Sequence, residues 1–404
     1  MDAGRPRTPP GRRRLLLSPP PPSVPMPSPS FSSGFFTAIA RSAWLAALLF
    51  LLPGAWGAGA SQYAIGADVS FLGQAEANGT VFKDEGVAKP GLQILKDHSF
   101  NWIRLRLFHT PSNSTRFPLP NDLPYTIALA KQARALGFKL LLDFHYSDTW
   151  ADPAKQTLPA AWKDLTHEQL VEAVFTYTRD TIAAFREAGV LPDMVQNGNE
   201  ITNGMLWPDG KLPENADNFA ALVRAGINGV DAGRGNLPRP KIMVQVESSG
   251  NVVKTKAFFD ALFARGVDCD VLGQSYYPWW HGSLLDLRET LNFMARTYRK
   301  EVMVVEAAYC WRPTEYLKHP APFPETPEGQ RDYLAAVHEI LLQVPEGRGT
   351  GVFWWEPMVP RRPGRTGGGM GSRGMFDDEG NALPVIRVFD RWARGHVPKA
   401  ESGD

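Results

Sequence analysis

Short apolar runs alternate with amphipathic stretches of helical period between residues 61 and 398. Eight of these runs have strand character: Tyr63–Ser70, Trp102–Phe108, Lys139–His145, Asp193–Asn199, Lys241–Glu247, Val271–Tyr276, Val302–Glu306 and Gly351–Glu356. Helical stretches separate them, including Pro124–Leu136, Thr166–Ala188, Val252–Ala264, Leu285–Tyr298 and Gly329–Leu342. Eight repeats of strand and helix predict one α/β domain, a (β/α)8 TIM barrel.

Glycine follows several of the predicted helices. Gly137, Gly189 and Gly266 each stand directly after a helical stretch and before the next strand. Glycine is the residue that most readily takes the left-handed conformation in which many helices end. We therefore expect these three residues to be helix caps.

Residues 1–60 are expected to lie outside the barrel. Residues 1–33 are rich in Pro, Ser and Arg, which predicts disorder. A compact apolar run, 43–52, follows Arg41, and small residues stand at 58–60, so we expect a secretory signal cleaved before Ser61. The alternative is an uncleaved membrane anchor, but the run is short for a membrane span. The expected location is secreted or periplasmic, with no stable membrane insertion after cleavage and a short tail at 399–404.

The net charge limits the possible partners, and the positions of the cysteines limit the possible disulfides. The formal net charge of +1 gives no reason to expect a nucleic-acid partner and favours an uncharged substrate. The only two cysteines, Cys269 and Cys310, precede one predicted strand and follow the next. This places them at opposite ends of the barrel, so we expect no disulfide. A monomer is expected.

Two glutamates end predicted strands, where a barrel of this kind carries its chemistry. Glu200 follows Asn199 after the fourth strand, and Glu306 ends the seventh, which lies across the barrel mouth. A retaining glycosidase needs one carboxylic acid to protonate the leaving oxygen and one carboxylate to attack the anomeric carbon. We predict Glu200 as acid/base, Glu306 as nucleophile, and Asn199 as a donor to the sugar 2-hydroxyl. The alternative is that either glutamate is a structural ion-pair partner.

Polar residues on other strands suit a supporting role. Arg104 and Arg106 are two residues apart and face the same side, so one of them could keep the nucleophile ionised. A barrel-interior salt bridge is the alternative for Arg104. Tyr276 and Tyr277 could hydrogen-bond the nucleophile or simply pack in the core.

Tryptophans concentrate at the predicted strand ends, which suits stacking against the apolar faces of sugar rings in a polysaccharide groove. They are Trp150, Trp207, Trp279, Trp280, Trp311, Trp354 and Trp355. Any single one of them could equally be core. Asp143 and His145 could contact sugar hydroxyls, although His145 could instead brace the loop beside the acid.

Motifs for other chemistries are missing from the sequence. There is no His-x-x-x-His pair, no Cys-x-x-Cys, no Asp-rich calcium loop and no glycine-rich phosphate loop. The Gly-x-Ser-x-Gly elbow of serine hydrolases is missing as well. We expect neither a metal nor a cofactor.

The strand-end motifs resemble glycoside hydrolase family 53, the arabinogalactan endo-β-1,4-galactanases, over essentially the whole predicted domain. The resemblance is carried by residues 66–70, 103–107, 143–153, 198–201, 275–280, 304–306 and 351–357. Residues 143–153, which read Asp-Phe-His-Tyr-Ser-Asp-Thr-Trp-Ala-Asp-Pro, are the longest and most specific of these.

The resemblance implies a TIM barrel that cleaves the β-1,4-galactan side chains of pectin, with Glu200 as acid/base and Glu306 as nucleophile. Residues 307–311 and 245–250 depart from the family pattern, which bears on subsite preference. Bacterial relatives hold a structural calcium after the seventh strand, but residues 312–327 offer few carboxylates, so this ion is not carried over. The alternatives are another β-glycan hydrolase of the same clan, a mannanase or glucanase, and a non-catalytic carbohydrate-binding barrel.

Overall fold

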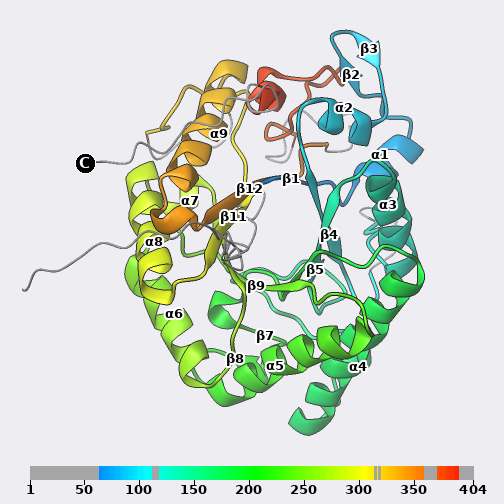
Figure 1. Ribbon diagram of the computed structural model, residues 1–404, viewed down its shortest axis with the longest axis vertical. Coiled ribbons are helices and arrows are strands. Elements are labelled where there is room, and N and C mark those ends of the chain that lie inside the picture. Colours follow the sequence, from blue (N-terminus) through cyan, green and yellow to red (C-terminus); the bar gives the residue numbers. More distant parts are fainter. Residues whose placement is uncertain (1–62, 112–117, 314–315, 317–319, 359–370, 391–404) are drawn as a thin grey trace, which may run out of the picture. The chain divides into compact units, whose positions relative to one another are not determined.

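The computed structural model describes residues 63–111, 118–313, 316, 320–358 and 371–390 (Figure 1). The predicted leader and signal peptide, residues 1–60, and the predicted tail, residues 399–404, lie outside the described residues. In the described part of the chain, no helix is long and apolar enough to cross a membrane.

A closed barrel of parallel strands forms the centre of the fold, in the order β1-β12-β11-β10-β9-β6-β5-β4 (Figure 1). Its strands are β1 (Ala64–Asp68), β4 (Trp102–Leu107), β5 (Lys139–Phe144), β6 (Met194–Asn197), β9 (Lys241–Val246), β10 (Val271–Tyr276), β11 (Glu301–Ala307) and β12 (Gly349–Trp355). The predicted (β/α)8 barrel is confirmed. Each predicted strand coincides with a barrel strand, and the ends differ by at most two residues.

Helices connect the strands and surround the barrel (Figure 1). They are α1 (Leu72–Ala77), α2 (Gly91–Asp97), α3 (Leu123–Ala135), α4 (His167–Glu187), α5 (Ala216–Gly233), α6 (Val252–Ala264), α7 (Pro278–His281), α8 (Leu284–Tyr298) and α9 (Pro327–Leu342). The five predicted helices correspond to α3, α4, α6, α8 and α9. Two small hairpins, β2 (Lys83–Asp84) with β3 (Val87–Ala88) and β7 (Gly204–Met205) with β8 (Gly210–Lys211), were not predicted because two-residue strands show no period.

Helix ends follow the sequence signals. Gly137, Gly189 and Gly266 have φ angles of +75°, +75° and +70°, which confirms the left-handed caps. At the start of α4, the hydroxyl of Thr166 accepts a hydrogen bond from the backbone N–H of Gln169, whose side chain bonds back to Thr166 in a capping box. These caps satisfy backbone groups that the helices themselves leave unpaired.

An apolar floor fills the amino-terminal end of the barrel. It consists of buried residues from all eight strands: Ala64, Trp102, Leu141, Met194, Met243, Val271, Met303, Val305 and Phe353. A Cβ atom on Gly66 would lie 2.1 Å from the Phe353 ring, so only glycine leaves room for this ring in the floor. A larger apolar layer packs the outer faces of the strands against the helices.

Candidate active site

A polar layer lies directly above the apolar floor. Side chains alternate along a strand, so the residues two and four positions beyond each floor residue face the barrel interior as well. On these positions stand Asp68, Arg104, Arg106, Asp143, Gln196, Gln245 and Ser275, all buried. The barrel interior therefore changes from apolar to charged toward the carboxyl ends of the strands.

Glu306 enters this polar layer because of a β-bulge. Ser275 pairs with Glu306 while the preceding residue of β10 pairs with Val304, so Val305 is an extra residue in β11. Strict alternation would turn Glu306 outward, since Val305 is part of the floor. A bulge re-aims the residue that follows it, and Glu306 lies inward with 5% of its surface exposed.

Arg104 and Tyr277 hold the Glu306 carboxylate. Nη2 of Arg104 lies 2.8 Å from Glu306 Oε1, and the Tyr277 hydroxyl donates a hydrogen bond of 2.9 Å to Oε2. Both contacts fix the position of the carboxyl group, one on each oxygen. The structure thus assigns to Arg104, and not to Arg106, the contact predicted for one of the two arginines.

Arg104 connects several strands of the barrel mouth. Its Nη1 bonds Asp68 Oδ2 at 2.8 Å, and its Nη2 bonds Asp143 Oδ2 and Asn199 Oδ1, both at 2.9 Å. Burial opposes the charge of this guanidinium, but Asp143, Glu306 and Asp68 outweigh burial and raise its pKa above the ordinary value. Arg104 is therefore a permanent cation, and each of its three guanidinium nitrogens has an acceptor.

Glu200 occupies a strained turn at the end of β6. Its φ angle is +49°, in the left-handed region that few side chains favour. Its backbone N–H donates to Gln245 Oε1 at 2.5 Å, and its carboxyl hydrogen-bonds Ser275. Burial, followed by the negative charge of Glu306, raises the pKa of Glu200 well above its ordinary value. The side chain remains partly exposed, so a proton held there can reach a substrate.

Asn199 and His145 are held by protein groups. The amide nitrogen of Asn199 donates to the Ala151 carbonyl at 2.8 Å, which leaves one amide hydrogen for a substrate. His145 places Nε2 3.1 Å from Asp143 Oδ2, and its Nδ1 accepts a hydrogen bond from the Ala151 N–H. His145 therefore braces the loop at Ala151, and both of its ring nitrogens have partners within the protein.

Arg106 binds two carboxyl groups and packs against a tryptophan ring. Its guanidinium bonds Asp68 Oδ1 at 3.0 Å and contacts Glu356 Oε1. It lies 4.3 Å from the ring centroid of Trp150, in cation–π geometry. Trp150 in turn packs against Trp355, with ring centroids 6.2 Å apart.

The predicted aromatic rim divides into two groups. Trp280 is 64% exposed, and Trp150, Trp207, Trp311 and Trp355 are partly exposed, whereas Trp279 is buried at 7%. Trp354 and Tyr276 face the opposite side of their strands and are buried in the outer core, where Trp354 donates to the Arg373 carbonyl and Tyr276 to the Gly282 carbonyl. These two residues give no surface for a sugar ring, because successive strand residues point to opposite faces.

Several residues of the site were missed by sequence reasoning. Gln196 donates to Asp143 Oδ1 at 2.7 Å, Gln245 accepts from the Glu200 backbone, and Ser275 bonds the Glu200 carboxyl. Extending the inward alternation from the floor residues along each strand would have identified them.

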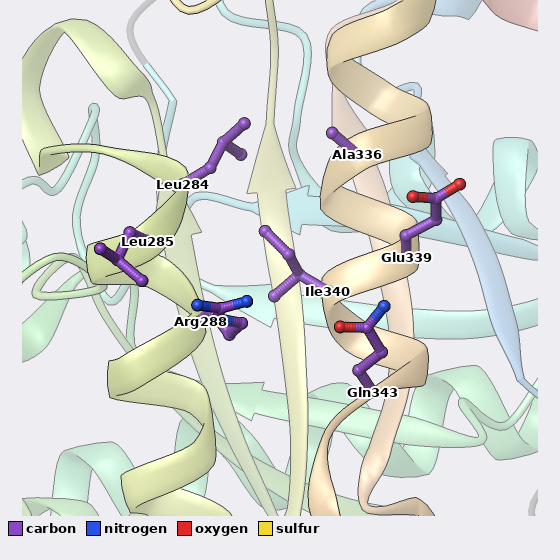
Figure 2. Close-up of a pocket in the computed structure, with 7 residues that line it drawn as sticks. All are labelled: Leu284, Leu285, Arg288, Ala336, Glu339, Ile340 and Gln343. Carbon is purple, nitrogen blue, oxygen red and sulfur yellow. The ribbon is translucent and has the colours of Figure 1, made fainter.

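A shallow hollow lies elsewhere, between α8 and α9 (Figure 2). It is lined by Leu284, Leu285, Arg288, Ala336, Glu339, Ile340 and Gln343. None of these residues belongs to a barrel strand, so the hollow is separate from the strand-end cluster.

The structure places the two cysteines and the side chains that could bind a metal ion. Cys269 and Cys310 are both buried and are not joined by a disulfide, as predicted. Within the described ranges, no group of three or more His, Cys, Asp or Glu side chains is arranged to hold a metal ion.

A (β/α)8 barrel with a charged strand-end layer and two carboxyl groups, one after β6 and one on β11, has the arrangement that a glycoside hydrolase needs. The family model for glycosyl hydrolase family 53 matches residues 64–389. The chain belongs to this family and is an O-glycosyl hydrolase.

The matches to relatives cover nearly the whole length of those proteins. An uncharacterised protein of Niallia circulans is 39% identical, with 80% of this chain and 92% of that protein covered. The arabinogalactan endo-β-1,4-galactanase of Thermothelomyces thermophilus is 34% identical, with 81% and 98% covered. Among solved structures, the Ignisphaera aggregans GH53 catalytic domain is 34% identical, with a TM-score of 0.75 and 81% and 96% covered.

Proposed function

We propose that this protein is a retaining endo-β-1,4-galactanase that hydrolyses the β-1,4-galactan of type I arabinogalactan, the pectin side chain. The substrate follows from the names of the relatives. The double-displacement mechanism is supported by a site in which Arg104 and Tyr277 hold the carboxyl group of Glu306 and the nearby charge of Glu306 helps to raise the pKa of Glu200. The reaction requires one carboxyl group that gives a proton to the leaving oxygen and one that attacks the anomeric carbon.

In the first step, a Glu306 oxygen attacks the anomeric carbon and forms a covalent bond to it. The glycosidic C–O bond breaks, and the leaving oxygen takes the proton of Glu200. As the Glu306 charge is consumed, it no longer opposes ionisation of Glu200, so the acid becomes a base. Glu200 then deprotonates a water molecule that attacks the anomeric carbon and releases Glu306.

Supporting residues have distinct proposed roles. Arg104 and Tyr277 orient the nucleophile, and Asn199 donates its remaining amide hydrogen to the sugar 2-hydroxyl. The exposed aromatic side chains, above all Trp280, Trp355 and Trp150, are proposed to stack against sugar rings along the groove. The enzyme is proposed to work without a cofactor.

Export is also proposed. Residues 1–60 have the composition of a basic leader followed by a secretory signal, which suits an enzyme whose polymeric substrate cannot enter a cell. Amino-terminal sequencing of the exported protein should begin at Ser61. An unprocessed amino terminus on the mature protein would contradict this cleavage.

The activity test is a reducing-sugar assay of purified protein on potato galactan, with mannan and carboxymethylcellulose in parallel. Galactan should be cleaved best; preferential cleavage of either other polymer would identify a different β-glycan hydrolase. Glu200→Gln and Glu306→Gln should each lose several orders of magnitude in kcat while remaining folded. The matched control is Glu339→Gln on α9, an exposed residue of the hollow in Figure 2. Full turnover in both site variants would refute the roles of Glu200 and Glu306, and a wild type that cleaves none of the polymers would favour a sugar-binding barrel.

The stereochemical test is proton NMR of freshly released product. Two successive displacements give net retention, so the β anomer should appear first and the α anomer only after mutarotation. A first-formed α anomer would contradict the role of Glu306 as nucleophile.

A further inference from the structure

Glu247 directly follows β9 at the barrel mouth and is held on both carboxyl oxygens. Its Oε1 lies 2.6 Å from Lys254 Nζ on α6, and its Oε2 accepts a hydrogen bond from the Thr202 hydroxyl. The backbone N–H of Glu247 donates to the same hydroxyl oxygen at 3.3 Å. The Glu247 side chain is only 10% exposed, so its position is well defined.

These contacts fasten the turn that carries Glu200. Thr202 lies in the 3-10 helix Ile201–Asn203, which begins immediately after Glu200. Gln245, two residues before Glu247, accepts the Glu200 backbone N–H. Gln245 and Glu247 therefore both hydrogen-bond the turn. These bonds hold the backbone of Glu200 at its left-handed φ of +49°, a conformation that costs free energy and that an unrestrained turn would leave.

Charged and titratable groups reach Glu200 from several elements. Its carboxyl faces Glu306 of β11, Arg104 of β4, Tyr277 after β10 and Glu247 after β9. Burial raises the pKa of Glu200 most, the charge of Glu306 comes next, and the charge of Glu247 adds in the same direction.

Glu247 has its own titratable neighbours, Lys254 on α6 and His281 on α7. Burial lowers the pKa of His281 to about 4, so this imidazole is neutral at working pH. The countercharge of Glu247 is therefore the ammonium group of Lys254, which lies on the exposed surface of α6.

We propose that Glu247 and Lys254 form a positioning pair for the acid/base. Glu247 fixes the turn of Glu200, and its negative charge helps Glu200 to retain its proton. Lys254 offsets part of the negative charge of Glu247. This inference rests on the proposed function of Glu200. Neither residue touches the reacting atoms, so their effect must appear in the protonation of Glu200.

The test is the pH profile of kcat/KM on galactan, whose alkaline limb reports the acid of the free enzyme. Glu247→Gln removes a negative charge, so Glu200 should lose its proton more easily and the limb should move to lower pH. Lys254→Met leaves Glu247 uncompensated, so the limb should move to higher pH. Each shift should be about half a pH unit, as for one partly screened charge nearby.

The matched control is Lys256→Met on the same helix, because Lys256 pairs with Asp260 rather than with a residue of the mouth. Its limb should coincide with that of the wild type. Alkaline limbs unchanged in both Glu247→Gln and Lys254→Met would overturn the proposal, as would shifts of the same sign. Reduced activity without a shift in Glu247→Gln would show a structural role only. Lys254→Met, a surface change, keeps the test valid if Glu247→Gln does not fold.

Failure of the proposed function has a different signature. In that case Glu200→Gln keeps full turnover, or the wild type does not cleave galactan, and the pairing proposal falls with it. If Glu200→Gln is inactive and the limbs do not move, only the role of Glu247 and Lys254 is refuted.

Discussion

Glu356 should make the protein less stable as the pH rises from acidic to neutral. This residue directly follows β12 and is 1% exposed. Its Oε1 contacts Arg106, but its Oε2 has no hydrogen-bond partner among the described residues. Burial raises the pKa of Glu356 from 4.5 to about 8, and Arg106 opposes this rise only in part.

The sign and size of the effect follow from linkage. Between pH 4.5 and about 8, the folded protein holds a proton on Glu356 that the unfolded chain has released. The stabilising contribution is therefore complete below pH 4.5 and is lost as the pH rises toward 8. Each pH unit in this window corresponds to about 1.4 kcal/mol, so roughly 3 kcal/mol would be lost by neutral pH.

Glu356→Gln imitates the protonated side chain and cannot ionise. We expect urea unfolding of wild type and variant at several pH values between about 5 and 8 to give nearly equal free energies at the acidic end, with the variant gaining up to a few kcal/mol toward the alkaline end. Taking the difference at each pH cancels the titration of other groups, and Glu339→Gln serves as the surface control. A difference that does not change with pH, or that grows in favour of the wild type, would refute the reasoning.

Three further substitutions test individual contacts. Tyr277→Phe removes the hydrogen bond to Glu306; since a bond to a charged group contributes about 1.5–3 kcal/mol, kcat/KM should fall roughly 10- to 100-fold with folding retained, and an unchanged value would show that Arg104 alone suffices. Gly66→Ala should destabilise the fold by at least about 2 kcal/mol, because its Cβ would lie 2.1 Å from the Phe353 ring; urea unfolding measures this, and no loss would mean that the ring can move. Thr166→Ala should cost about 1 kcal/mol by removing the α4 cap, with activity unaffected, and a loss of activity would be unexpected.

The fold and the two carboxyl groups were predictable because they depend on local patterns. Strand composition and helical period repeat along the chain, and a barrel of this kind brings the carboxyl ends of its strands together. Glu200 and Glu306 each end an apolar run, so their common location at the mouth followed from the topology alone. The helix caps at Gly137 and Gly189 depend on the same kind of local signal.

Details that depend on side-chain direction were not predictable with the same rules. Glu306 points inward only because Val305 is an extra residue in β11, and no local pattern marks this bulge. Trp354 and Trp355 are neighbours in sequence, but one is buried in the outer core while the other is partly exposed near Trp150. The inward direction of Gln245 follows only once Met243, two residues earlier, is known to belong to the apolar floor.

The excess of carboxyl groups over guanidinium groups explains why two glutamates keep protons. Among the described residues of the barrel strands, the buried arginines are Arg104 and Arg106. The carboxyl groups around them belong to Asp68, Asp143, Glu200, Glu306 and Glu356. Complete ionisation would leave uncompensated negative charge in a buried site, which is costly, so protons bind the carboxyl groups at which the cations do not offset the cost of burial. Arg104 bonds Asp68, Asp143 and Glu306 directly. Burial outweighs the cations at Glu200 and Glu356, whose pKa values are raised, and this charge balance is the source of the proton on the proposed acid, Glu200.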